Sequence, residues 1–197
     1  MNRRTALRNA GHTAGALILI PSLLTLLHSC KSASRVDWQP LFLSDEEARF
    51  ISSMVDTLLP RTTTPGALDV KVDIFLDTLM AKTYNVEEQK NVRSEMAAFN
   101  EMCSKDHGGE FADLDQSGKA AALQVAETNS ATFNGGVWGT AVGEQAPVAF
   151  YRRLKAMAVW AYCSSEEIGE HVLKYDPIPQ EYLGCIPLKE GEHRWSL

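Results

Sequence analysis

Residues 44–60, SDEEARFISSMVDTLLP, carry the pattern that decides the fold class. Ser44 and Glu47 form a capping box, in which each side chain accepts a hydrogen bond from the other residue's backbone amide. Apolar residues then recur at three- and four-residue spacing, as on one face of an α-helix. They are Ala48, Phe50, Ile51, Met54, Val55, Leu58 and Leu59. Pro60 ends the helix because it has no amide hydrogen. The stretch predicts an amphipathic helix that buries one face in a core.

Three further helices are predicted downstream. The turn at 61–67, RTTTPGA, is favoured by its threonines, proline and glycine. A helix over about 69–82 follows, and a longer one, capped by Asn85 and Glu88, runs to about residue 105 before Gly108. Asp115 is expected to cap a helix through residue 126. The expected inner residues are Val70, Ile74, Phe75 and Leu79, then Val92, Met96, Phe99 and Cys103, then Ala120, Leu123 and Ala126.

The last third of the chain combines a loop, a helix and an extended arm. Residues 129–145 are rich in Gly, Asn, Ser and Thr and predict a long loop that carries Phe133 and Trp138. Pro147 suits the first turn of a helix over 148–162, and a short helix follows the break at 163–165. No segment alternates as a strand would. The predicted fold is therefore all-α, a bundle of five to six helices with an irregular C-terminal arm.

The C-terminal arm is dense in aromatic residues and proline. Such side chains bury a large area in protein contacts and have little conformational entropy to lose. The arm is therefore expected to contact a partner protein, or to fold back on its own bundle, or to do both with different faces. The predicted contact residues are Trp160, Tyr162, Tyr175, Pro177, Pro179 and Tyr182.

Residues 1–30 predict an export signal. The start is cationic with the pair Arg3-Arg4, and residues 14–27 are apolar but too short and interrupted for a membrane span. The paired arginine resembles the twin-arginine signal, which carries proteins folded before translocation. Residues 27–30, LHSC, resemble a bacterial lipobox, in which Cys30 becomes the lipidated N-terminus; the alternative is a plain signal peptide with an incidental cysteine. We expect a tether at 31–42, a helical domain at 43–197, and a membrane-anchored lipoprotein of the periplasm or cell envelope.

The charge of the chain limits the kinds of partner it can bind, and its cysteines allow a disulfide. Three of the 19 Lys and Arg residues lie in residues 1–30, which hold no acid, so residues 31–197 carry 16 against 25 Asp and Glu, a formal charge of −9. An acidic body without a basic stripe argues against nucleic acid as a partner. Export leads to an oxidising compartment, where Cys103, Cys163 and Cys185 can form one disulfide. The Cys163–Cys185 pair would close the arm; the alternative is three reduced, buried cysteines.

Convergent catalytic groups are not evident in the sequence. Glu167 and His171 are four residues apart but have no third ligand at a suitable spacing, so a solvated helix face is favoured over a metal site. Asp113 and Asp115 read as a helix cap rather than as paired catalytic carboxylates. There is no CxxC or CxxCH motif, and the glycine pairs lack the setting of a phosphate-binding loop. The sequence therefore assigns no catalytic, cofactor-binding or metal residue to this chain.

Several blocks together resemble one family, the small subunit (subunit 3, or gamma) of gluconate 2-dehydrogenase-type membrane-associated flavoprotein dehydrogenases. The blocks are residues 56–60 (DTLLP), 64–67 (TPGA), 75–77 (FLD), 162–169 (YCSSEEIG), 175–179 (YDPIP) and 182–185 (YLGC). Cys163 stands where we expect the family to carry Thr, so a Cys163–Cys185 bridge is not expected to be a family feature.

This resemblance implies an accessory subunit. The large partner would be a flavoprotein of the glucose-methanol-choline type that holds FAD and oxidises a sugar, sugar acid or glycoside, and a c-type cytochrome often takes the electrons. The small subunit would help the large one mature and be exported. Two rival hypotheses are a free-standing envelope lipoprotein that binds a small ligand or another envelope protein, and an enzyme in its own right.

Overall fold

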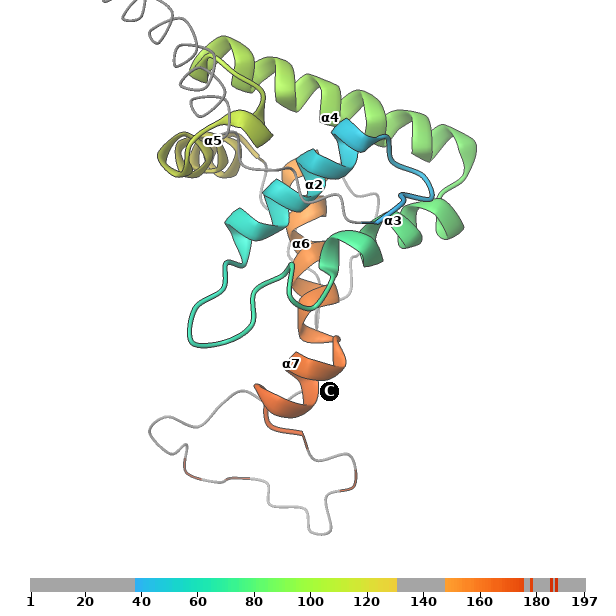
Figure 1. The fold of residues 1–197 in the computed structure, drawn as a ribbon, viewed down its shortest axis with the longest axis vertical. Coiled ribbons are helices and arrows are strands. Elements are labelled where there is room, and N and C mark those ends of the chain that lie inside the picture. Colours follow the sequence, from blue (N-terminus) through green and yellow to red (C-terminus); the bar gives the residue numbers. More distant parts are fainter. Residues whose placement is uncertain (1–37, 131–147, 176–177, 179–184, 186, 188–197) are drawn as a thin grey trace, which may run out of the picture. The chain divides into compact units, whose positions relative to one another are not determined.

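The structure is a computed structural model and describes residues 38–130, 148–175, 178, 185 and 187. These residues form six α-helices, one short 3-10 helix and no strand. In chain order they are α2 (Asp45–Leu58), α3 (Val72–Thr83), α4 (Val86–His107), η1 (Phe111–Asp113), α5 (Gln116–Asn129), α6 (Phe150–Cys163) and α7 (Glu166–His171) (Figure 1). The predicted all-α class is confirmed. Among the described helices, none has the length and apolar character needed to cross a membrane.

The helix ends follow the capping signals of the sequence. Both halves of the Ser44–Glu47 capping box are present at α2, and Asn85 with Glu88 forms a second one at α4. Helix α4 ends at Gly108, whose φ of 81° lies in the left-handed region that glycine adopts without strain. Asp115 accepts a hydrogen bond from the amide of Gly118 at the start of α5. These four signals place the helix ends within about two residues of the prediction.

Two helices begin later than predicted. Helix α3 starts at Val72 because Lys71 has a left-handed conformation, with a φ of 59°, which no α-helix can include. Asp69, expected inside this helix, instead uses its side chain to bind the preceding turn. Helix α6 starts at Phe150, and the extended conformation of Ala149 marks its N-cap. The predicted loop begins later than expected, because Asn129 still belongs to α5; its residues 131–145, with Phe133 and Trp138, and Pro147 lie outside the described residues.

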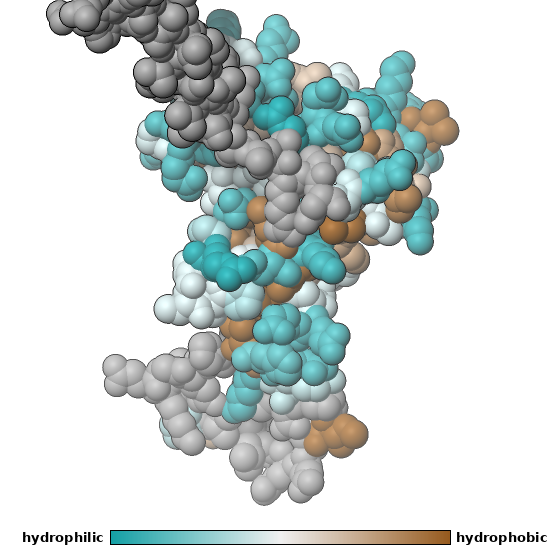
Figure 2. Space-filling model, in the orientation of Figure 1, coloured by the Kyte–Doolittle hydropathy of each residue, from teal (hydrophilic) through white to brown (hydrophobic). Residues whose placement is uncertain are grey.

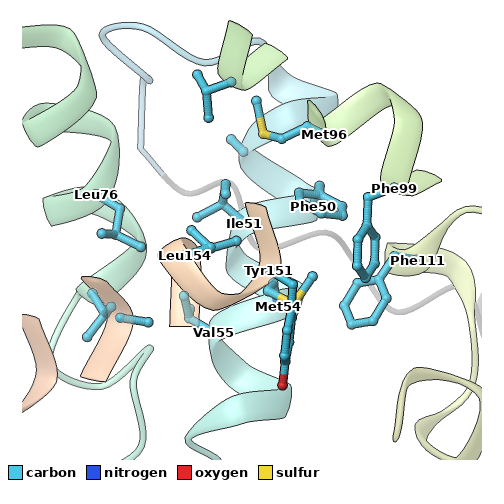
Figure 3. Close-up of a cluster of buried hydrophobic side chains, with 14 of the residues drawn as sticks. Phe50, Ile51, Met54, Val55, Leu76, Met96, Phe99, Phe111, Tyr151 and Leu154 are labelled. Carbon is cyan, nitrogen blue, oxygen red and sulfur yellow. The ribbon is translucent and has the colours of Figure 1, made fainter. Parts of the chain in front are cut away.

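Helix α2 lies at the centre of the bundle and packs against α3, α4, α5, α6 and η1. Its Phe50 meets the rings of Phe99 and Phe111 edge to face, with centroids 5.7 and 5.8 Å away (Figure 3). Beside it, Ile51 faces Leu154 of α6 in the same cluster (Figure 3). All four residues predicted to face the core from α4, namely Val92, Met96, Phe99 and Cys103, are buried.

The inner face predicted for α3 is right only in part: Val70 and Leu79 pack against the core, but Phe75 does not. The buried residues are Val72, Asp73, Leu76, Asp77 and Met80, whereas Ile74 and Leu79 are only partly buried and Phe75 is exposed. Two carboxylates thus occupy positions that hydropathy assigns to the outside. Asp73 is satisfied by the hydroxyl of Ser52 on α2, which donates a hydrogen bond of 2.8 Å, and by the amide of Ile74. Asp77 is satisfied by backbone amides from the segment before α2. A buried polar group is tolerated when it is hydrogen-bonded, which explains the rotation of α3.

Candidate functional site

Trp160 is the most exposed of the predicted contact residues that the structure describes in a helix. It lies on α6 with 54% of its surface exposed and packs against Phe75 of α3, which is 41% exposed. The ring centroids are 5.6 Å apart and the planes are tilted by 57°. We call Phe75 and Trp160 the aromatic ledge. Two large rings that shield each other but stay open to solvent on one side suit a protein contact. Figure 2 shows apolar side chains reaching the surface along α6, in the middle of the view.

Tyr162 has an internal role, whereas Tyr175 is exposed. The Tyr162 hydroxyl donates a hydrogen bond of 2.7 Å to the carbonyl oxygen of Pro65, and the side chain is only partly exposed. Tyr175, just beyond α7, is 47% exposed. Pro177, Pro179 and Tyr182 lie outside the described residues. Their contact role, like that of Trp160, Tyr162 and Tyr175, stays a prediction.

The turn between α2 and α3 is held in one shape by its own side chains. The amide of Ala67 bonds back to the carbonyl oxygen of Leu59 at 2.8 Å. The Asp69 carboxylate accepts hydrogen bonds from the Gly66 amide and from the Arg61 guanidinium. A Cβ atom at Gly66 would lie 2.5 Å from the backbone nitrogen of Arg61, so only glycine allows this close approach.

Asp77 fixes the segment that leads into α2. Its carboxylate accepts hydrogen bonds from the amides of Leu41, Phe42 and Leu43 at 2.7, 3.0 and 2.9 Å. From the other side, Arg93 of α4 donates to the carbonyl oxygen of Phe42 and lies 4.4 Å from the centroid of its ring. Trp38 and Phe42, at the end of the predicted tether, therefore pack against the helical body, while 31–37 lie outside the described residues.

A hollow of about 840 Å³ separates the Arg61–Pro65 turn from α7. Lys71, Ser165, Glu166, Glu167 and His171 also line it. The Glu167–His171 pair thus faces a recess, but no group of three or more His, Cys, Asp or Glu residues suited to a metal ion occurs among the described residues.

Cys163 and Cys185 are both exposed and carry free thiols in the structure, so their pairing stays a prediction. Cys103 is buried, and burial raises the pKa of its thiol to about 11, with Asp106 adding to the shift. The export residues Arg3 and Arg4 and the lipidation residue Cys30 lie outside the described part of the chain.

Several described residues of the blocks that resemble the small-subunit family stabilise the fold. Gly66 and Tyr162 shape the turn, Asp77 holds the segment before α2, and Ala67 and Leu76 are fully buried. Hydropathy analysis missed Phe75 as a surface residue because it placed this residue on the inner face.

Comparison with protein families gives a match to Gluconate 2-dehydrogenase subunit 3 over residues 45–179. The match begins at the first residue of α2, extends past α7 and covers more than half of the chain. Comparisons with curated proteins and with solved structures give no match. The helical body and the blocks that shape its turn thus lie within one family match, and this chain belongs to the gluconate 2-dehydrogenase subunit 3 family.

Proposed function

We propose that this chain is a non-catalytic accessory subunit that binds, stabilises and helps export the catalytic flavoprotein of its dehydrogenase complex. The observation that carries the proposal is the family match over residues 45–179, since that family is a subunit of an oxidoreductase complex. The structural roles of Gly66, Asp77 and Tyr162 support the proposal, because these residues of the family's blocks stabilise the helical body and its surface. The partner would be of the glucose-methanol-choline type, hold the FAD and oxidise a sugar, sugar acid or glycoside. A c-type cytochrome would accept the electrons.

The proposed location is the periplasm or cell envelope, with the chain anchored in the membrane by a lipid on Cys30. The support comes from the cationic start, the apolar stretch and the lipobox-like LHSC. A twin-arginine route would let the two subunits travel folded and together under one signal. Replacing Arg3 and Arg4 by Lys should then trap both the precursor and its partner inside the cell. Normal export of the variant would exclude this route.

The experiment is a mild-detergent pull-down of the tagged native protein, followed by an absorbance scan and mass spectrometry. A flavin band with a co-eluting chain of large-subunit size is the expected result. A colourless single chain would contradict the proposal and favour a free-standing lipoprotein. Dehydrogenase activity in the purified chain without a partner would contradict its non-catalytic character.

A further inference from the structure

Helix α7, which follows directly after the helix that carries Trp160, exposes an acidic surface. Ile168 is buried and fixes the inner side of this short helix, while Glu166, Glu167 and Glu170 are exposed. Within the part of the chain that the structure describes, none of these three carboxylates takes part in an ion pair or a side-chain hydrogen bond. Other exposed acids, such as Asp113 with Arg49, do have a cationic partner.

Helix α7 borders the hollow, and the aromatic ledge lies about one helical turn from residues at its edge. Lys71 lines the hollow and lies one helical turn before Phe75, whose amide bonds to the Lys71 carbonyl oxygen. Ser165 and Glu166 line it too, and the amide of the neighbouring Ser164 bonds to the carbonyl oxygen of Trp160. One helical turn is about 5.4 Å long. The aromatic ledge and the three glutamates of α7 are therefore close enough for one partner surface to contact both. We call Phe75, Trp160, Glu166, Glu167 and Glu170 the docking face.

The negative charge of the docking face indicates which kind of partner can bind there. In a twofold dimer a residue patch meets itself, so a second copy would bring six glutamates together on a body that already carries −9 over residues 31–197. Anionic lipid headgroups and nucleic acid phosphates would be repelled in the same way. A protein surface with Lys or Arg around an apolar centre is the complement of this face.

We propose that the docking face binds the catalytic subunit of the complex, through a surface of that subunit that sets Lys or Arg side chains around an apolar residue. The inference rests on the proposed function and adds to it the surface and the chemistry of the contact. The two halves of the face then have separate roles. The glutamates steer the encounter and raise the association rate, and this contribution weakens with salt. Trp160 on Phe75 supplies the buried aromatic anchor, which governs the dissociation rate.

The test uses the full-length chain in detergent and the co-purifying flavoprotein as its probe. Trp160→Ala should weaken binding by about thirtyfold, as expected for an aromatic hot spot, mainly through faster dissociation. Reversing all three glutamates to Lys should slow association about tenfold or more at low salt, with a smaller effect at high salt. The association rate of the neutral triple Gln variant should lie between those of this variant and the wild type, and circular dichroism of each variant would establish that the helical body stays folded.

A triple reversal of Glu87, Glu101 and Asp106 is the matched control, because these exposed acids lie on α4 and the change in net charge is the same. It should associate at nearly the wild-type rate.

Equal slowing by the control and the α7 variant would overturn the proposal, since net charge alone would then be responsible. Wild-type binding by both Trp160→Ala and the α7 variant would also overturn it and would leave the accessory role intact. A wild-type chain that captures no flavoprotein would instead contradict the proposed function itself. Concentration-dependent dimers of the wild type that Trp160→Ala abolishes would assign the face to a second copy.

Discussion

The hydroxyl of Tyr162 donates a 2.7 Å hydrogen bond to the carbonyl oxygen of Pro65, 97 residues earlier in the chain. The bond ties the C-terminal turn of α6 to the turn between α2 and α3. Both residues belong to the blocks that resemble the small-subunit family. The tyrosine predicted as a partner contact therefore also holds together the elements that frame the hollow beside α7.

Tyr162→Phe should lower the free energy of unfolding by about 1 kcal/mol, because it removes one partly buried hydrogen bond and leaves the Pro65 carbonyl oxygen without this donor. Urea denaturation followed by circular dichroism measures the change. The matched control is Tyr175→Phe, which removes an exposed hydroxyl and should change stability by less than ~0.5 kcal/mol. Equal stability of the two variants would show that the Tyr162 bond contributes nothing.

Asp77→Ala should be more damaging, because it leaves three backbone amides without their acceptor. The expected loss of stability is about 3 kcal/mol, since each buried unsatisfied donor costs about 1–3 kcal/mol and two of the three amides are only partly buried. Asp77→Asn keeps one acceptor oxygen and should lose less. Asp106→Ala removes an exposed carboxylate from the last turn of α4 and serves as the control, with little or no loss. A loss for Asp77→Ala no larger than that of the control would show that water replaces the carboxylate.

Gly66→Ala should lower the melting temperature by about 2–8 °C, the equivalent of about 1–2 kcal/mol in a chain of this size. The reason is steric, because the new Cβ atom would lie 2.5 Å from the Arg61 nitrogen and the backbone would have to move. Gly109→Ala is the matched control, since its Cβ atom would meet only Leu114 at an ordinary 3.7 Å. Calorimetry of both variants checks the contrast. Equal melting temperatures would mean that the turn relaxes without cost.

The sequence predicted the parts of this fold that local patterns determine, and it missed the parts that depend on contacts between distant residues. The buried face of α4 was predicted residue by residue, because a single apolar stripe decides it. The face of α3 was predicted only in part, because Asp73 and Asp77 are buried by partners 21 to 36 residues away that no periodicity reveals. The same rotation brings Phe75 to the surface against Trp160. The sequence therefore indicated Trp160 as a candidate contact but missed its neighbour.

Cys103 makes stability depend on pH in the alkaline range. The folded state raises the pKa of this thiol from 9.0 to about 11, mainly because burial disfavours the thiolate. The folded state therefore binds the proton more tightly than the unfolded state, so the stabilisation is complete below pH 9 and is lost as the pH rises from about 9 to 11. The loss is on the order of 3 kcal/mol, since each of the two units of pKa corresponds to about 1.4 kcal/mol. Urea denaturation between pH 8 and 11 should show this decline in the wild type.

Cys103→Ala is the control for this prediction and should remove that part of the decline, although it also lowers stability at every pH by creating a small cavity. The same pattern of decline in both proteins would assign the effect to other groups. Thiol labelling gives an independent check, because Cys103 should react only after denaturation, whereas Cys163 and Cys185 are exposed. The same labelling tests the predicted Cys163–Cys185 bridge in native protein isolated under oxidising conditions. If neither cysteine is labelled before reduction and both are labelled after it, the bridge is established.

Ending the chain after Val172 should separate folding from partner binding. The truncated chain keeps α2 to α7 and the hydrogen bond from the Val172 amide to the Ile168 carbonyl oxygen, so the helical body is expected to stay folded. It lacks Tyr175, Pro177, Pro179 and Tyr182, and binding of the catalytic subunit should fall below detection if the arm supplies part of the contact area. Circular dichroism and the detergent pull-down measure the two properties separately. A full-length Tyr175→Ala, Tyr182→Ala variant removes two of the aromatic side chains without shortening the chain, so weaker binding by it would attribute the loss to these side chains. If both variants bind like the wild type, the contact is confined to the helical body.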